Sequence, residues 1–295
     1  MEKYKILIIS DPKGPDYIED LAVATSFKRD GHIVKVFGIG YETKYDEKFD
    51  ILLRRNTWVE NKPQTDLYDF RNGNLMERLM YRKVPGINII GFQEEDYSYL
   101  ETLTKKGEPN VIPTITSKKD LEILQQFSDS KQFVLRKKED YYLNKNSAIC
   151  VNIDNLSKLF TKDIHLIQAD LKFKSEVEFY FVGNKLMYAF EYAPTKYNKL
   201  AKERLINISE EDRKVVQRIA DLSDLRYGMQ RLDFVRLENN ELMLMDIRDT
   251  SVKMNLYKID SNMRNEVITE YKKGIYEFLS SDPQTIKCSL YCRSM

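Results

Sequence analysis

Arg231-Leu-Asp-Phe-Val-Arg236 begins the stretch that decides the fold of this chain. It continues through a polar turn, Glu238-Asn-Asn240, into Glu241-Leu-Met-Leu-Met-Asp-Ile-Arg-Asp249. Apolar and charged residues alternate on both sides of the turn, which is typical of a β-hairpin. We expect the hairpin to bring four charged residues towards one end: Arg231, Asp233, Asp246 and Asp249. Carboxylates clustered beside an arginine favour a site for magnesium and phosphate.

The composition restricts the partners and the location of the protein. The chain has 295 residues, with 47 basic against 46 acidic side chains, so its charge favours neither nucleic acid nor an anionic membrane as a partner. Its apolar runs are strand-sized, far short of the roughly 20 residues that a membrane helix needs. With 3 cysteines, an odd number, free thiols are expected instead of a disulfide framework. These features predict a soluble, cytoplasmic protein.

The first hundred residues alternate strand patterns with helix patterns at 17–29 and about 74–82, which predicts an open parallel sheet with helices on its faces. Ligands of such sheets bind at the carboxyl ends of the strands, and Arg54, Arg55 and Asn56 lie at the end of the strand predicted at 49–54. Arg54 could hold a substrate carboxylate in a bidentate pair, or it could be a solvated charge at a strand end. The loop of residues 11–15 contains one glycine, too few for a dinucleotide-binding fingerprint.

Two further units follow in the sequence. Residues 111–170 read as a small α+β unit, with predicted strands at 132–136, 148–152 and 164–168. Residues 171–295 read as an antiparallel sheet with helices, containing a tight turn at Gly183-Asn184. Residues 194–204 form a basic stretch that we interpret as a loop, and helices are expected at about 209–221 and 262–279.

The order of these motifs resembles the ATP-grasp superfamily, in particular the glutathione synthetase-like and D-alanine-D-alanine ligase-like enzymes. The resemblance covers nearly the whole chain and rests on an ordered series of segments: Tyr99-Leu-Glu-Thr-Leu, Val111-Ile-Pro-Thr, Phe133-Val-Leu-Arg136, Leu166-Ile-Gln168, Glu176-Val-Glu178, Arg231-Leu-Asp-Phe-Val and Leu244-Met-Asp-Ile-Arg-Asp249. It implies an α/β and α+β architecture with three parts: an N-terminal parallel α/β domain at 1–110, a central subdomain at 111–170 and a C-terminal subdomain at 171–295.

The resemblance also implies the residues of the site. Asp233 and Asp246 match metal-binding positions, and Asp249 is a displaced third candidate. Arg231 matches an arginine on the transferred phosphoryl group, while Lys196 and Arg136 would hold the phosphates. Nucleotide contacts are expected from the adenine hinge and from a carboxylate on the ribose: Gln168, Ala169, Asp170, Leu171 and Glu176. The implied cofactors are ATP and Mg²⁺, because phosphoryl transfer depends on positioning and on neutralising charge.

The chain departs from the pattern of this superfamily at both ends of the implied site. Arg136 replaces a lysine, Tyr97 replaces another, and residues 137–146 contain no glycine where a glycine-rich phosphate loop is expected. Asp246 replaces a longer glutamate. Arg248 stands where an asparagine or glutamate ligand is expected, and a cation cannot bind magnesium.

Three functional hypotheses follow. The first is a ligase that joins a small carboxylate, such as an amino acid or peptide, to an amine through an acyl-phosphate. The second is a weakly active or inactive ATP-grasp protein that serves as a nucleotide-binding or partner subunit, and the third is an α/β binding protein without a nucleotide. The expected partners are small molecules, with a homodimer as an option, and neither nucleic acid nor membrane.

Overall fold

The computed structural model describes most of the chain. The described residues are 2–10, 17–38, 48–55, 85–88, 98–126, 132–137, 149–162, 165–195, 198–222, 226–249 and 252–281. Several expected features lie outside them, including the helix predicted at 74–82, the loop at 138–146, and Cys288 and Cys292. None of the helices in the described part of the chain is long and apolar enough to cross a membrane.

The N-terminal unit is a parallel sheet, as the βαβ pattern predicts. Its strand order is β2-β1-β3-β4, and the strands are β1 (Lys5–Ser10), β2 (Ile33–Gly38), β3 (Ile51–Arg54) and β4 (Gly86–Ile87). Helix α1 (Tyr17–Arg29) connects β1 to β2 and has the predicted bounds. The central strand β1 is almost wholly apolar and is buried from Ile6 onwards. This composition suits a strand that is paired on both edges and covered by other elements.

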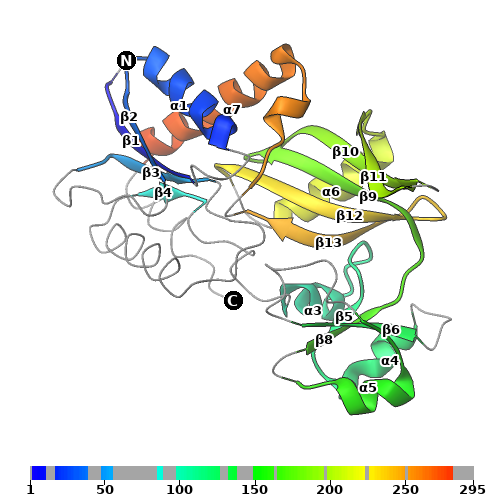
Figure 1. Cartoon of the computed structure of the whole chain (residues 1–295). Helices are drawn as coiled ribbons and strands as arrows, with labels where there is room; N and C mark the ends of the chain where they lie inside the picture. The colour runs from blue at the N-terminus through cyan, green and yellow to red at the C-terminus, as the bar shows by residue number, and fades with distance from the viewer. Residues whose placement is uncertain are drawn as a thin grey trace.

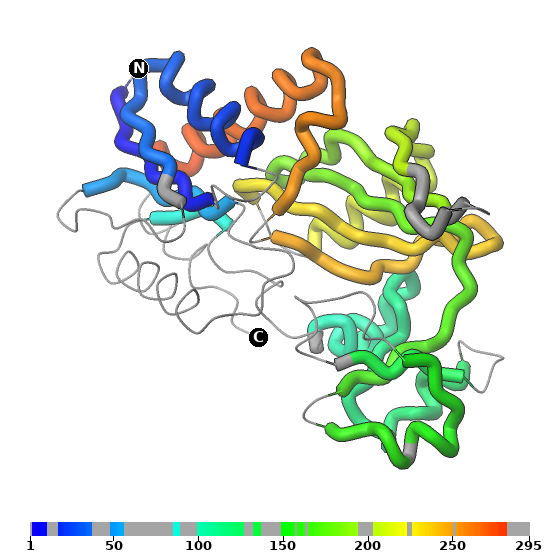
Figure 2. The backbone as a smooth tube through the Cα atoms, viewed as in Figure 1, coloured from blue at the N-terminus to red at the C-terminus, as the bar shows by residue number. Residues whose placement is uncertain are grey.

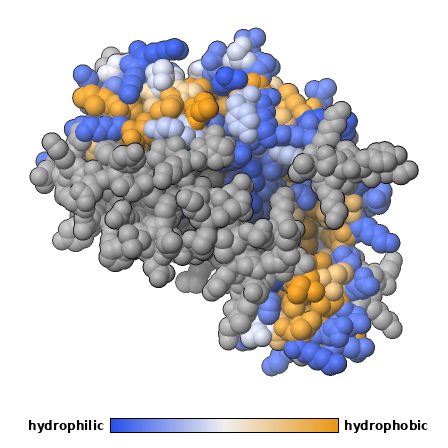
Figure 3. Space-filling model, in the orientation of Figure 1, coloured by the Kyte–Doolittle hydropathy of each residue, from blue (hydrophilic) through white to orange (hydrophobic). Residues whose placement is uncertain are grey.

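The small central unit is an antiparallel sheet with three α-helices and a short 3-10 helix, Lys118–Asp120. Its strand order is β5-β8-β6-β7, and the strands are β5 (Thr114–Ile115), β6 (Gln132–Lys137), β7 (Ile149–Asn152) and β8 (His165–Ala169). The α-helices are α3 (Ser98–Lys105), α4 (Leu121–Gln125) and α5 (Ile153–Leu159). Figure 3 shows apolar surface on this unit. Ile149, Ile153 and Leu159 are exposed residues of its β7 and α5.

A five-stranded antiparallel sheet forms the largest unit (Figure 1). Its strand order is β11-β10-β9-β12-β13, and the strands are β9 (Phe173–Val182), β10 (Lys185–Thr195), β11 (Asn198–Ile206), β12 (Met229–Leu237) and β13 (Leu242–Arg248). The hairpin of β12 and β13 is the one that the opening stretch predicts. At the predicted β9–β10 turn, Gly183 has a φ of 53°, and a Cβ there would lie 2.7 Å from the Arg226 carbonyl oxygen. Glycine is therefore required at this turn.

Two long helices cover opposite faces of this sheet. Helix α6 (Glu210–Leu222) packs Val216 and Ile219 on one face, against Phe179 and Phe234. Helix α7 (Ser261–Ser280) lies beside α1 (Figure 1) and contributes to a core that contains residues of β1 and β3 together with Tyr180 and Met229. The N-terminal unit and the large sheet therefore share one hydrophobic core, and the chain crosses from the small unit to the large sheet through residues 170–172 (Figure 2).

The interpretation of residues 194–204 as a loop is wrong. β10 continues to Thr195, and β11 runs antiparallel to it over Asn198–Ile206. The many lysines and arginines favour solvent and so suggest a loop, but β11 is an edge strand. Charged side chains are common on edge strands, because they prevent further strand pairing.

A buried arginine joins the N-terminal unit to the large sheet. Arg55 is only 1% exposed; its Nε donates to Asp20 Oδ1 at 2.9 Å, and its Nη1 lies 2.9 Å from Met229 Sδ. Glu19 in turn accepts the backbone N–H groups of Met254 and Leu256. Burial by itself would lower the pKa of Arg55, but the neighbouring carboxylates outweigh it and raise this pKa. The cluster consequently stays charged within the shared core.

We predict that Arg55→Met destabilises the protein strongly. The change leaves Asp20 and Glu19 buried without their cation, and removal of one partner from a buried ion pair costs about 3–5 kcal/mol. Urea unfolding followed by circular dichroism measures this loss. Arg29→Ala, at an exposed position of α1, is the control and should change stability by less than about 0.5 kcal/mol. Equal effects of the two changes would contradict the structural role of Arg55.

His32 forms a second contact between the N-terminal unit and α7. Its Nδ1 accepts the backbone N–H of Tyr4 at 3.2 Å, and its Nε2 lies 3.0 Å from the Tyr276 hydroxyl. Tyr276 also donates to Asp30, which accepts a further hydrogen bond from Lys272. Burial lowers the pKa of His32 and outweighs the attraction of Asp30. The folded protein therefore favours the neutral ring.

We predict a loss of stability as the pH falls below about 6.5, the ordinary pKa of histidine. The unfolded chain takes up the proton more readily than the folded one, so protonation of His32 favours unfolding. Unfolding free energies at pH 7 and pH 5.5 test this, with His32→Phe as the comparison. Because His165 is present in both proteins, the difference isolates His32. An equal pH dependence of the two proteins would contradict the prediction.

Candidate active site

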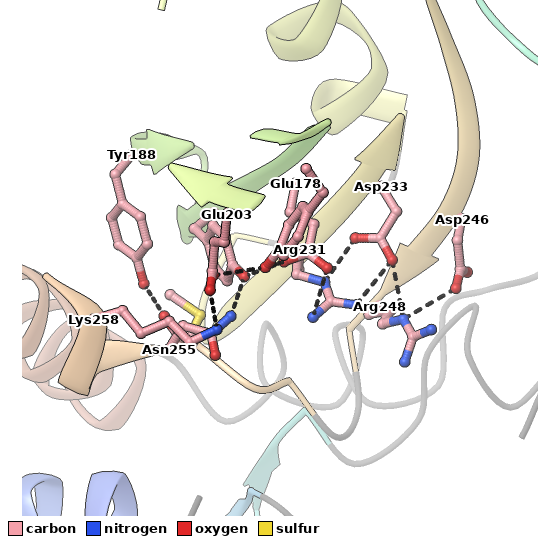
Figure 4. Close-up of polar contacts among 12 residues, drawn as sticks. Glu178, Tyr188, Glu203, Arg231, Asp233, Asp246, Arg248, Asn255 and Lys258 are labelled. Carbon is pink, nitrogen blue, oxygen red and sulfur yellow. Dashed lines mark hydrogen bonds and ion pairs between the residues drawn. The ribbon is translucent and has the colours of Figure 1, made fainter. Parts of the chain in front are cut away.

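Two rows of charged side chains cross the large sheet where β9, β12 and β13 lie side by side. Asp233 on β12 is directly opposite Glu178 on β9 and Asp246 on β13. Two residues along, Arg231 is directly opposite Tyr180 and Arg248. Residues two apart on a strand share a face, so an acidic row lies beside a basic one (Figure 4).

A β-bulge places Asp246 and Arg248 on this face. Asp233 pairs with Asp246 but Phe234 pairs with Leu244, so Met245 is an extra residue in β13. Leu244 and Ile247 both belong to the core under α6, although they are three residues apart. Strict alternation from Leu244 would have turned Asp246 into that core. The bulge therefore creates the acidic row.

Arg231 is clamped by carboxylates on two strands. Its Nε donates to Asp233 Oδ1 at 2.7 Å, its Nη2 donates to Asp233 Oδ2 at 2.9 Å, and its Nη1 lies 3.5 Å from Glu178 Oε1. Burial alone would lower the pKa of Arg231, but Asp233 and Glu178 outweigh it and raise this pKa well above the ordinary value. The guanidinium is thus a fixed positive charge in a preorganised position.

Arg248 lies between the two candidate metal ligands. Its Nε is 3.2 Å from Asp233 Oδ2 and 3.1 Å from Asp246 Oδ2. The other oxygen of Asp246 accepts a hydrogen bond of 3.2 Å from Tyr99, whose hydroxyl also accepts the Ile247 N–H. Each carboxylate oxygen of Asp233 and Asp246 therefore faces a donor of the protein itself.

The residue types of this site suit magnesium, but their arrangement does not. Two buried aspartates facing each other offer the hard oxygen ligands that Mg²⁺ prefers, yet Arg248 takes the position between them. Asp249 is fully buried beyond β13, where its carbonyl accepts a 2.5 Å hydrogen bond from Asn88. Among the described residues, no group of three or more His, Cys, Asp and Glu side chains is placed to hold a metal ion. The structure brings Asp233 and Asp246 together without grouping Asp249 with them.

The predicted adenine hinge lies where the small unit joins the large sheet. Gln168 and Ala169 end β8 and are buried, and the Gln168 side chain donates to Thr114 Oγ1 at 3.2 Å. Ala169 N–H donates to the Pro113 carbonyl at 3.0 Å. The two chain segments that connect the units are therefore hydrogen-bonded to each other at residues 113–114 and 168–169.

An apolar cluster beside the hinge was not identified from the sequence. It joins the connecting segments to the face of β12 and β13, and its members are Ile112, Leu171, Val235, Leu237, Met243 and Met245. Such a cluster offers a planar base an apolar surface close to hinge backbone groups. The alternation of Met243 and Met245 could have indicated it, but the bulge obscures which face these residues occupy.

The remaining predicted residues lie at separate positions. Glu176 is half-buried on the same face of β9 as Glu178, opposite Val235 and Tyr192, and Arg136 is half-buried in β6 opposite Leu166. Arg54 is half-buried at the end of β3, as expected. Lys196 and Asn56 lie outside the described residues.

A chain of hydrogen bonds that the sequence did not reveal extends the site beyond Arg231. Glu178 Oε2 accepts the hydroxyls of Tyr180 at 2.5 Å and Tyr192 at 2.8 Å, and Tyr192 also lies 2.9 Å from Glu203. Burial, followed by the charge of Glu178, raises the pKa of both tyrosines, so they stay protonated donors. The tyrosines have no period in the sequence and gave no signal, because Tyr180 and Tyr192 come together only when β9 and β10 pair.

Comparison with known proteins identifies the fold. No family model and no curated protein matches the chain. Among solved structures, the D-cycloserine synthetase DcsG superimposes with a TM-score of 0.64 at 15% identity, covering 94% of this chain and 100% of that one. The macrocyclase MdnC of Microcystis aeruginosa, bound with precursor peptide MdnA, gives 0.62 at 10% identity over 92% and 99% of the two chains. The ATP-grasp ligase PsnB with minimal precursor, Mg and ADP gives 0.60 at 11% identity over 90% and 97%.

The chain therefore has the ATP-grasp fold. This confirms the resemblance and the predicted fold class. At these identities the likeness concerns the architecture, so the roles of individual residues depend on the geometry described above.

Cys150 offers a chemical probe of the hinge. Its thiol donates to Asp170 Oδ2 at 3.4 Å, and its pKa is raised by partial burial and then by Asp170. We predict that Cys150 is alkylated by iodoacetamide at pH 8 more slowly than a small-molecule thiol, and that Asp170→Asn accelerates the reaction, because the thiolate is the nucleophile.

Peptide mass mapping separates Cys150 from the other two cysteines. Asp154→Asn, at an exposed position of α5, is the control and should leave the rate unchanged. An unchanged rate in Asp170→Asn would show that the hinge carboxylate does not act on this thiol.

Proposed function

We propose that the protein is an ATP-dependent ligase that joins a small carboxylate, an amino acid or peptide, to an amine through an acyl-phosphate. The observation that carries this proposal is Arg231, a buried guanidinium clamped by Asp233 and Glu178 on the sheet of an ATP-grasp fold. A fixed positive charge of this kind stabilises the negative charge that develops on a transferred phosphoryl group.

The nucleotide would lie between the small unit and the large sheet. The backbone of Gln168–Leu171 would contact adenine, with the apolar cluster at Ile112 and Met243 beneath the base. Glu176 lies on the Arg231 face of the sheet and suits the ribose hydroxyls. Arg136 and Lys196 are the proposed phosphate ligands.

The carboxylate substrate would bind near the end of β3. Arg54 and Asn56 are the proposed contacts, while the adjacent Arg55 is excluded because Asp20 and Glu19 occupy it in the core. A planar guanidinium binds a carboxylate through two parallel hydrogen bonds, which also orients it for reaction.

The proposal includes magnesium, which would bind together with ATP and neutralise the charge of its phosphates. The likeness to PsnB, which was solved with Mg and ADP, supports it. Asp233 and Asp246, with Asp249 as a third candidate, are the proposed carboxylates at the metal end. The cytoplasmic location also remains a prediction.

The second function, a nucleotide-binding subunit without turnover, is favoured by one observation: Arg248 between Asp233 and Asp246. A thermal-shift titration with ATP and Mg²⁺ followed by an assay of ADP release separates the two functions. Stabilisation without ADP release on supplying amino-acid and peptide mixtures would favour this second function.

We predict that Asp246→Asn abolishes ATP turnover and leaves the fold intact. The change removes a negative charge from the acidic row. Arg248 and the cation that accompanies the phosphates therefore lose an anionic partner. ADP release measures turnover, and circular dichroism measures folding. Glu241→Gln, at the exposed end of the same hairpin, is the matched control and should behave as the wild type. Unchanged turnover in Asp246→Asn would rule out this carboxylate.

A further inference from the structure

Arg248 occupies a bridging position. Its Nε carries a single hydrogen, which is shared between Asp233 Oδ2 at 3.2 Å and Asp246 Oδ2 at 3.1 Å. The two oxygens come from different strands and converge on one point. Convergence of carboxylates from two strands on one cation is the arrangement that a divalent ion would otherwise stabilise.

Burial makes a cation at this point necessary. The side chains of Asp233 and Asp246 are 6% and 4% exposed, whereas Arg248 is 30% exposed. Buried carboxylates in adjacent positions repel each other, and removing them from water increases the cost. Arginine cannot lose its proton in a protein, so Arg248 supplies this cation at every physiological pH.

The charges of the two rows are almost balanced. Little negative charge therefore remains to attract a further ion between these carboxylates. Glu178, Asp233 and Asp246 carry three negative charges, and Arg231 and Arg248 carry two positive ones, which leaves one net negative charge. An uncharged residue at position 248 would leave two, which a divalent ion would neutralise. Mg²⁺ also requires oxygens at about 2.0–2.1 Å, which is incompatible with a guanidinium between the same two oxygens.

We propose that Arg248 is a built-in cation that replaces a divalent metal ion between Asp233 and Asp246. The pair then binds no metal by itself, and the complex with ATP contains one divalent ion fewer than it would with an uncharged residue at this position. The guanidinium also places a second fixed positive charge beside Arg231 on the face where the phosphates would lie. The inference about the nucleotide complex rests on the proposed function.

The first test uses the metal alone. In thermal unfolding without nucleotide, Mg²⁺ or Mn²⁺ should leave the wild type unchanged and should raise the melting temperature of Arg248→Asn by at least about 2 °C, because that variant lacks the cation that Asp233 and Asp246 share. Arg213→Asn, at an exposed position of α6, is the matched control and should respond as the wild type. Arg248→Lys keeps the charge and should also fail to respond to metal.

The second test counts ions in the nucleotide complex. Electron paramagnetic resonance of Mn²⁺ with a non-hydrolysable ATP analogue should detect one bound ion per chain in the wild type and two in Arg248→Asn. Equal counts in the two proteins, or equal stabilisation of both by metal alone, would overturn the proposal. If Arg248→Asn does not fold, Arg248→Gln replaces it in both tests.

The two proposals fail in different ways. If neither protein binds the nucleotide analogue, the proposed function is refuted, whatever the metal-alone result. If both bind it and the wild type contains two ions, the function stands and the role of Arg248 is refuted.

Discussion

The register of β9, β12 and β13 is the constraint on which the rest of the site depends. It places Glu178, Asp233 and Asp246 in one row, directly opposite each other on adjacent strands. Like charges in such positions destabilise a sheet, and burial makes the repulsion stronger. The sheet is stable because the next row contains Arg231 and Arg248, each of which contacts two of the carboxylates. The pairing that forms the sheet therefore also forms the charged site.

The strand register also separates the parts of the fold and of the site that could be predicted from the sequence from those that could not. The hairpin, the parallel N-terminal sheet and helix α1 followed from local periodicity, which depends on residues close in the chain. The expected position of Arg231 beside Asp233 also followed, since residues two apart share a face. The convergence of Asp233 with Asp246 on Arg248 required the bulge at Met245. A bulge changes the phase of a strand without a strong local signal, so the sequence suggested the residues of the site but not their contacts.

Two further features depend on tertiary structure in the same way. The basic segment that forms β11 has a loop-like composition, yet it becomes an edge strand because β10 offers it an unpaired edge. Arg54 and Arg55 are equivalent in the sequence, but the direction of each side chain at the end of β3 separates them. Arg55 points into the core that α1, α7 and the large sheet share, where Asp20 and Glu19 hold it. Only the packing of these units distinguishes a structural arginine from a candidate substrate ligand.

The two arginines of the site differ in how firmly they are held. The Arg231 side chain is 9% exposed, and its guanidinium donates one hydrogen bond to each oxygen of Asp233. This bidentate geometry restricts its rotation. Arg248 is 30% exposed and touches its two carboxylates through one nitrogen. A buried acidic row that depended on a dissociable ion would be stable only when the ion was bound. With Arg248 in the chain itself, most of the negative charge of the row is balanced before any ligand arrives, so the stability of the sheet is separated from the binding of metal and nucleotide.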